Sequence, residues 1–236
     1  MNADLDEWLG MGSAAIADWG GHVRRLAQRG NLGAARGLLL DLPALAQPHA
    51  CRSGTCAPGL REPRRRSCCA DLDVEVTPGE AGRITEALPL VAAWMKPRDA
   101  RWQGGVPETM DGATLRRPGR RCVFAASNAE GLTCSLHAIE DETGRPRGAL
   151  KPMPCRLFPI VVVDLGDNHV LLTALARHTS ALAGGGGAAA FPCLRGEAGP
   201  TLVESAADTL VELWSRATAR AVVRAVERWR AETAKG

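Results

Sequence analysis

The sequence has no tyrosine, only three phenylalanines, and no apolar run of the roughly 18 residues that a membrane-spanning helix needs. Its first residues, MNADLDEWLG, are acidic, whereas a secretory signal begins with basic residues and continues with apolar ones. The chain also lacks GxSxG, a phosphate-binding loop, GxGxxG and HExxH. These absences predict a cytoplasmic protein without a membrane partner. They leave enzymatic activity uncertain, and a protein that is not an enzyme is the simpler expectation.

The charge is nearly balanced, because 29 Lys and Arg stand against 26 Asp and Glu and the net charge is +3. Two basic runs, REPRRR and RRPGRR, have no aromatic residues between them that could stack on bases. We therefore interpret these guanidinium groups as facing water or as offsetting the charge of nearby thiolates. A nucleic-acid partner is not expected.

The chain does contain cysteine, and four of its eight thiols fall within a short segment rich in Gly, Pro and Arg, residues 49–70. This segment has no apolar periodicity from which a core face could form, so something other than hydrophobic burial must order it. The eight residues are Cys51, Cys56, Cys68, Cys69, Cys122, Cys134, Cys155 and Cys193.

Three interpretations of these thiols compete. Disulfides suit an exported chain, and no export signal is present. Buried thiols that act as small hydrophobic groups could explain Cys122 or Cys193, but not the polar run around Cys51 to Cys69. Metal binding explains that run, because structural zinc contributes on the order of 10–16 kcal/mol in small peptides. Thiolates favour zinc, copper(I) or iron–sulfur clusters over magnesium and calcium.

The spacing does not match a standard zinc finger, since the chain has no CxxC pair. Cys68 and Cys69 are adjacent, and neighbouring side chains reach one ion only where the chain turns sharply. Otherwise they serve two centres, or two irons of one cluster. The expected cofactor is therefore zinc or an iron–sulfur cluster, for example of the 4Fe–4S type.

Local signals predict helices in the first half of the chain. The apolar pattern of residues 13–46 is typical of one or two short amphipathic helices broken near Gly30. Thr77 and Glu80 form a capping box that begins another helix, which is expected to bend or end near Pro89.

In the second half, a Gly-Asp-Asn turn separates two apolar, β-branched runs and predicts strands near Leu157–Asp164 and His169–Ala174. Thr201 and Glu204 form a second capping box, at the start of a long amphipathic helix. The apolar side of that helix is expected to carry Leu202, Ala206, Leu210, Leu213 and Ala217.

Together these elements predict a single α+β domain, in which helices pack around a small β-hairpin and irregular loops are tied by a cysteine metal cluster. Within it, residues 1–48 form an N-terminal helical segment that packs on the core. Residues 49–199 form the cysteine-cluster region, and residues 200–236 form the C-terminal amphipathic helix of the same domain.

The order of the motifs resembles a known family. Cys68-Cys69 is followed by TPGEAGRI, then by CVFAASNAEGLTCSLH and KPMPCRLFPIVV. Over about residues 50–195 this resembles the YkgJ-like family of zinc- or iron-chelating cysteine-cluster proteins. The resemblance implies a hairpin between Cys122 and Cys134, and prolines that hold the sulfur of Cys155 toward the metal.

The resemblance also implies a set of metal ligands. Cys68, Cys69, Cys122, Cys134 and Cys155 match the family's motifs directly. Cys56 would precede the Cys-Cys pair, Cys193 would close the set, and Cys51 lies further out.

Two other classes of function stay open beside metal binding. Relatives of this family include flagellin lysine N-methylases with a cysteine cluster, so one alternative is an iron–sulfur-containing enzyme. The other is an interaction module that uses the 201–230 helix for self-association or a protein partner. His49 and His137 lie near candidate ligands and could complete a Cys₃His site, or they face solvent.

Overall fold

The structure is a computed structural model that describes residues 18–50, 66–127, 131–183, 188–196 and 199–235. The fold class is α+β, as predicted, but the chain forms two compact units rather than one. We call the described residues of Met1–Ala50 and Leu157–Gly236 the sheet unit, and those of Cys51–Arg156 the cysteine unit. The predicted small hairpin is part of a four-stranded mixed sheet, and two further hairpins lie in the cysteine unit.

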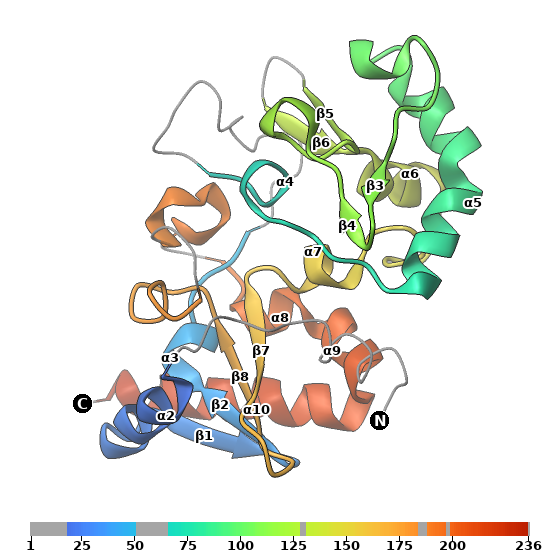
Figure 1. The fold of residues 1–236 in the computed structure, drawn as a ribbon. Coiled ribbons are helices and arrows are strands. Elements are labelled where there is room, and N and C mark those ends of the chain that lie inside the picture. The colour runs from blue at the N-terminus through green and yellow to red at the C-terminus, as the bar shows by residue number, and fades with distance from the viewer. Residues whose placement is uncertain (1–17, 51–65, 128–130, 184–187, 197–198, 236) are drawn as a thin grey trace. The chain divides into compact units, whose positions relative to one another are not determined.

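The sheet unit is built around that mixed sheet, whose strand order is β1-β2-β8-β7. β2 pairs with β8 in parallel, and the two outer pairs are antiparallel. α10 packs against β1 and α3, and it runs across the strands (Figure 1). In chain order the elements are α2 (Trp19–Gln28), β1 (Leu32–Ala35), β2 (Leu38–Asp41), α3 (Leu42–Leu45), β7 (Ile160–Asp164), β8 (Val170–Ala174), the 3-10 turns η3 (Ala188–Ala190) and η4 (Pro192–Leu194), α8 (Leu202–Ser205), α9 (Ala207–Leu213) and α10 (Arg216–Thr233).

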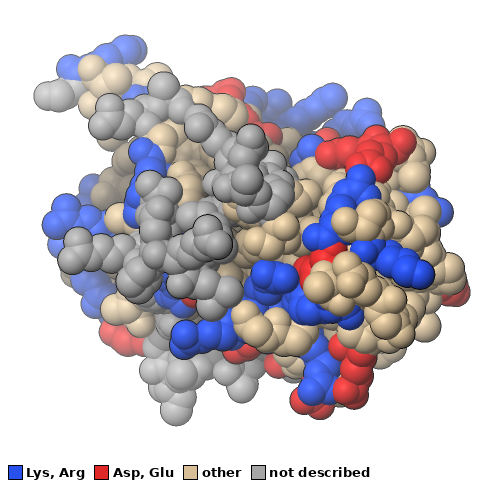
Figure 2. All heavy atoms as spheres, turned by 90° about the horizontal axis from the view of Figure 1, so that it is seen from above, with Lys and Arg blue, Asp and Glu red and all other residues tan. Residues whose placement is uncertain are grey.

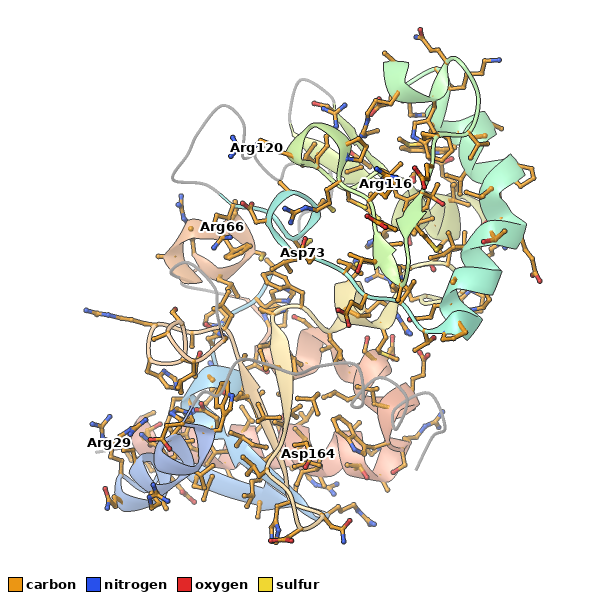
Figure 3. All side chains as sticks on the ribbon, viewed as in Figure 1. Arg29, Arg66, Asp73, Arg116, Arg120 and Asp164 are labelled. Atoms are coloured by element: carbon orange, nitrogen blue, oxygen red, sulfur yellow. The ribbon has the colours of Figure 1, made fainter. Side chains whose placement is uncertain are left out.

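The predicted hairpin is confirmed as β7 and β8. Its turn places Gly166, Asp167 and Asn168 at positive φ, a conformation that Gly, Asp and Asn adopt most readily. Asp164 lies at the end of β7 and accepts the backbone N–H of Gly166 at 2.8 Å (Figure 3). β7 begins at Ile160 rather than Leu157, because Met153–Leu157 forms a short helix, α7.

The N-terminal helical prediction is correct only in part. α2 ends at the expected place, where Gly30 has φ of 67°. The leucine-rich run that follows forms strand β2, and only the four residues Leu42–Leu45 are helical. A short, continuous apolar run fits a buried strand and a buried helix equally well, so periodicity could not separate the two.

The predicted C-terminal helix is three helices. Its capping box is present, with the N–H of Thr201 donating to Glu204 Oε2 at 2.6 Å. The chain breaks at Trp214, and Ser215 caps α10 by accepting the N–H of Thr218 at 3.0 Å. Because the break changes the direction in which side chains point, Ala217 is exposed instead of lying on the apolar face.

The cysteine unit has its own core, in which α5 packs against α6. The capping box of Thr77 and Glu80 begins α5 as predicted, but the helix continues past Pro89 to Met95. The elements are α4 (Cys68–Asp71), α5 (Pro78–Met95), η1 (Ala100–Trp102), β3 (Met110–Asp111), β4 (Thr114–Leu115), η2 (Pro118–Arg120), β5 (Ala125–Ser127), β6 (Leu132–Cys134), α6 (Ser135–Thr143) and α7 (Met153–Leu157) at the boundary with the sheet unit. The largest fully buried side chains of this core are Ile84, Met95, Trp102, Phe124, Leu136 and Ile139.

Basic and acidic side chains are mixed over the face of the molecule that Figure 2 presents. Within the predicted basic run, Arg116 pairs with Glu108, and Arg117 pairs with Asp73 at 3.3 Å. Figure 3 marks Asp73 just beyond α4 and Arg116 beside β4. Carboxylates therefore already offset part of this charge. None of the helices in the described ranges has the length and hydropathy needed to cross a bilayer.

Candidate functional site

Five of the predicted ligands lie in the described part of the cysteine unit, each at a turn or at the end of an element. Cys68 and Cys69 begin α4, which Ser67 caps by accepting the N–H of Ala70 at 3.1 Å. The other three come from separate segments: Cys122 follows η2, Cys134 ends β6, and Cys155 lies in α7. All five are free thiols and partly buried.

Backbone hydrogen bonds join the segments that carry these thiols. The N–H of Cys122 donates to the carbonyl oxygen of Cys69 at 2.6 Å. In the β5–β6 hairpin, Cys134 pairs with Ala125. Arg101 donates to the carbonyl oxygen of Ala125 at 2.6 Å and so fixes the same region from outside the hairpin. Three of the four segments are thus connected through the main chain.

Two buried carboxylates hold the fourth segment, which carries Cys155. Glu80 uses Oε2 in its capping box, and its Oε1 accepts the N–H of Met153 at 2.6 Å. Glu140 Oε1 accepts the N–H groups of Gly148, Leu150 and Lys151 at 3.1, 2.6 and 2.7 Å. This side-chain anchoring, in addition to the prolines around Cys155, orders the loop.

The thiols affect one another's ionisation. Cys68 Sγ lies 4.0 Å from Cys69 Sγ. A hydrogen bond from Cys69 is the main cause that lowers the pKa of Cys134 to about 6, against the opposing effect of burial. The positive charge of Lys151 and the N–H groups of His137 and Leu136 also lower it. The same hydrogen bond raises the pKa of Cys69 well above its usual value, so Cys69 is the donor and Cys134 the thiolate.

The remaining two thiols belong to the same group. Burial raises the pKa of Cys122 to about 12, and negative charge on Cys134 and Cys68 adds to the shift. Burial also raises the pKa of Cys155, with further contributions from Cys68, Cys122 and Cys134. Because charges in a protein shift each other's pKa appreciably only at short range, all five sulfurs are electrostatic neighbours. We call these five residues the thiol group.

The thiols do not meet at the distance that a single shared ion requires. Two thiolates bound to one zinc at about 2.3 Å lie about 4 Å apart. Among the residues described, no three cysteine sulfurs lie within 4.8 Å of one another. The expected metal cluster is therefore not present at coordination distance among the described residues.

Comparisons with protein-family models, curated proteins and solved structures find no match. The resemblance to the YkgJ-like family thus remains a prediction that depends on the order of the motifs. One element that it implies is present, namely the β5–β6 hairpin between Cys122 and Cys134.

Cys193, the predicted closing ligand, belongs to the sheet unit. It lies in η4 and packs in a small apolar cluster with Phe191 and Leu175. Cys51 and Cys56 lie outside the described residues. A ligand role for these three cysteines stays a prediction.

The two candidate histidines lie in different units. His49 is in the sheet unit, where its backbone N–H donates to the carbonyl oxygen of Pro200 at 3.0 Å. His137 is in α6, and its Nε2 pairs with Asp141 at 3.2 Å. His137 lies in the same unit as the thiol group, whereas His49 does not. A ligand role for His137 stays a prediction.

A second group of potential ligands, which the sequence did not reveal, lies in the sheet unit. Asp41 ends β2 and caps α3, where its Oδ1 accepts the N–H of Ala44 at 3.2 Å. Its Oδ2 lies 2.9 Å from His22 Nε2 and 3.1 Å from His178 Nε2, and it accepts the hydroxyl of Thr173 at 2.8 Å. The two imidazole rings stack, with centroids 5.7 Å apart.

Burial alone would raise the pKa of Asp41, but hydrogen bonds from His178, His22 and Thr173 outweigh burial and hold the pKa below its usual value. The two histidines are 19 and 137 residues from Asp41 along the chain. No local motif could have identified His178, because the parallel pairing of β2 with β8 is what brings its segment to Asp41, and His22 comes from a separate element, α2.

Proposed function

We propose that the cysteine unit binds an inorganic centre through the thiol group, Cys68, Cys69, Cys122, Cys134 and Cys155. The observation that supports this most directly is that four separate segments bring their thiols into one compact unit, where the thiols affect one another's pKa values. Four thiolates are enough for a zinc site or for one iron–sulfur cluster. The five cysteines can therefore supply a complete set.

The main alternative is that these thiols are small hydrophobic groups. Cys122, Cys134 and Cys155 do pack against the apolar core. An inert thiol in apolar surroundings would, however, be expected to stay protonated. Here the hydrogen bond from Cys69, followed by the charge of Lys151, lowers the pKa of Cys134 to about 6, and the same two causes lower the pKa of Cys68. The pKa values of the other three thiols are raised. Cys134 and Cys68 are therefore the thiols at which metal binding would begin.

The spacing favours an iron–sulfur cluster over a single zinc ion. Cys68 and Cys69 have a separation, 4.0 Å, that suits two ligands of one zinc, but no three cysteine sulfurs among the described residues lie within 4.8 Å of one another. In a 4Fe–4S cluster each thiolate binds a different iron, so the sulfurs stand further apart than the ligands of one ion.

The test is metal analysis of the full chain purified without oxygen, before and after reconstitution with ferrous iron and sulfide. We expect iron and acid-labile sulfide in similar amounts, with broad visible absorption from thiolate-to-iron charge transfer. If the protein is colourless and holds zinc, the proposal of a metal site stands, but the preference for an iron–sulfur cluster is refuted. A protein that takes up neither metal would overturn the proposal.

Single substitutions identify the ligands. Cys134→Ser and Cys155→Ser should each reduce iron content and visible absorption together. Cys193→Ser is the matched change in the sheet unit, and it should leave both values unchanged if the thiol group is sufficient. Equal iron content in all three variants would exclude the thiol group as the binding site.

A further inference from the structure

We propose that His22, Asp41 and His178 bind one divalent transition-metal ion, Zn²⁺ or Fe²⁺, in the sheet unit. The three ligand atoms, His22 Nε2, Asp41 Oδ2 and His178 Nε2, all lie within 4.8 Å of one another. This site shares no residue with the thiol group, and it does not depend on the function proposed above.

The distances are close to those around a single ion. In a tetrahedral site, nitrogen and oxygen ligands at about 2.0–2.2 Å from zinc lie about 3.3–3.6 Å apart. The two distances from Asp41 Oδ2, 2.9 Å to His22 Nε2 and 3.1 Å to His178 Nε2, are shorter than this, as expected for groups that are hydrogen-bonded without an ion. Side-chain movements of about half an ångström would bring these two pairs to coordination spacing.

Four donors converge on the Asp41 carboxylate. Ala44 donates to Oδ1, the Thr173 hydroxyl donates to Oδ2, His22 Nε2 lies beside Oδ2, and His178 Nε2 lies 3.2 Å from Oδ1 and 3.1 Å from Oδ2. The lone pairs of the two oxygens can accept all four donors, so the group is stable without an ion. If an ion replaced the two imidazole protons, both nitrogens would become ligands beside the carboxylate, and Thr173 and Ala44 would remain as its donors.

The surroundings are rigid, with one open side. Asp41 is fully buried and His22 is 4% exposed, whereas the side chain of His178 is 37% exposed. Ala44 and Thr173 orient the Asp41 carboxylate, as outer partners commonly orient metal ligands. An ion could therefore enter beside His178 and keep a coordination position for water.

The donor set selects the class of metal. Two imidazoles and one carboxylate suit zinc, ferrous iron and related divalent ions. Magnesium and calcium prefer sites made entirely of oxygen, and copper(I) prefers sulfur. Three protein ligands with an open position differ from the closed four-ligand sites that zinc uses for structure.

The test compares the full-length wild type with His178→Ala and His169→Ala. His169 is an exposed histidine in the β7–β8 turn of the same unit, and it serves as the matched control. Zn²⁺ binding is measured by calorimetry, and Co²⁺ is added as a spectroscopic probe. Thiolate ligands give Co²⁺ intense charge-transfer bands, whereas His and Asp ligands give only weak visible bands, so the two sites can be read separately.

We expect the wild type and His169→Ala to bind one more equivalent of Zn²⁺ than His178→Ala. Loss of this ligand should weaken the site by more than about 100-fold, beyond what loss of an outer partner costs. His178→Gln, which keeps a polar side chain of similar size, should behave as His178→Ala does. The proposal is wrong if His178→Ala and the wild type bind equal amounts of Zn²⁺, or if only the thiolate bands of Co²⁺ change.

Discussion

Glu140 Oε1 accepts the backbone N–H of Lys151 at 2.7 Å, and the same oxygen accepts the N–H groups of Gly148 and Leu150. Glu140 is only 1% exposed and Leu150 is buried, whereas Gly148 and Lys151 are partly buried, so the N–H of Leu150 in particular has little access to water in the absence of Glu140. One buried carboxylate therefore fixes the main chain that carries both Lys151 and, four residues later, Cys155.

Glu140→Ala should destabilise the cysteine unit. Leaving buried donors without partners costs about 1–3 kcal/mol, so we expect the free energy of unfolding in urea to fall by about 3 kcal/mol. Glu140→Gln should cost less, because the amide oxygen can still accept hydrogen bonds. Glu86→Ala in α5 is the control in the same unit, since Glu86 is exposed, and it should change stability by no more than about 0.5 kcal/mol. Equal stability of Glu140→Ala and Glu86→Ala would show that the loop does not depend on the Glu140 carboxylate.

Asp99 should make stability depend on pH in the acid range. Its buried carboxylate accepts Arg101 Nη2 at 2.7 Å and Arg121 Nη2 at 3.0 Å. Burial raises the pKa of Asp99, but the hydrogen bonds and charge of Arg101, together with the charge of Arg121, lower it overall. In the unfolded chain the pKa of this carboxyl should be about 3.9. Its contribution is therefore complete above that pH and is lost as the pH falls through the lower pKa of the folded state.

Asp99→Asn isolates this contribution. The difference in unfolding free energy between the wild type and Asp99→Asn should be constant between about pH 5 and 7 and should shrink below about pH 4. Asp111→Asn is the control, because Asp111 is exposed in the β3–β4 hairpin. The prediction is refuted if the difference in unfolding free energy between the wild type and Asp99→Asn stays constant down to about pH 2.5.

Ser215 should account for part of the stability of α10. Its hydroxyl accepts the N–H of Thr218 at 3.0 Å where α9 and α10 meet. Replacing such a cap by alanine costs about 1 kcal/mol, so Ser215→Ala should lower the thermal midpoint of the sheet unit by a few degrees. Thr233→Ala, in the exposed last turn of the same helix, should have a much smaller effect. If both variants melt at the same temperature, the cap is not important.

Signals that lie within a few residues predicted the fold best. Both capping boxes and the β7–β8 turn are where the sequence placed them, because each depends on contacts within one turn of chain. The leucine-rich run of β2 was assigned to a helix. Its burial depends on pairing with β8, in which Leu38 pairs with Val170, 132 residues further along the chain. Long-range pairing of this kind leaves no local pattern to recognise.

The same limit applies to the two candidate sites. The cysteines could be selected because their residue type alone suggests metal chemistry. The residues that support the thiols could not be selected in the same way, because Glu and Lys are common surface residues. Only the fold buries Glu140 and places Lys151 near the thiols. Asp41 was overlooked for a related reason, because it lies in a run that was assigned to a helix and its histidine partners come from other segments.

The last prediction concerns thiol reactivity, which should differ strongly within the thiol group. The pKa is about 6 for Cys134 and about 12 for Cys122. At pH 7 their ionised fractions then differ by about 10⁵. The lower nucleophilicity of the more acidic thiolate offsets roughly 10²–10³ of this difference. In metal-free protein we therefore expect iodoacetamide to modify Cys134 about 100-fold faster than Cys122, as measured by mass spectrometry of the peptides.

The pH dependence of this reaction separates ionisation from accessibility. Modification of Cys134 should rise with a midpoint near pH 6 and reach a plateau by about pH 7.5, whereas modification of Cys122 should still be rising at pH 9. Two thiols that differed only in exposure would instead show the same midpoint with different plateaus. Loading the protein with metal should protect both residues if they are ligands. Cys193, in the sheet unit, should keep its rate and so control for any general effect of the metal on folding.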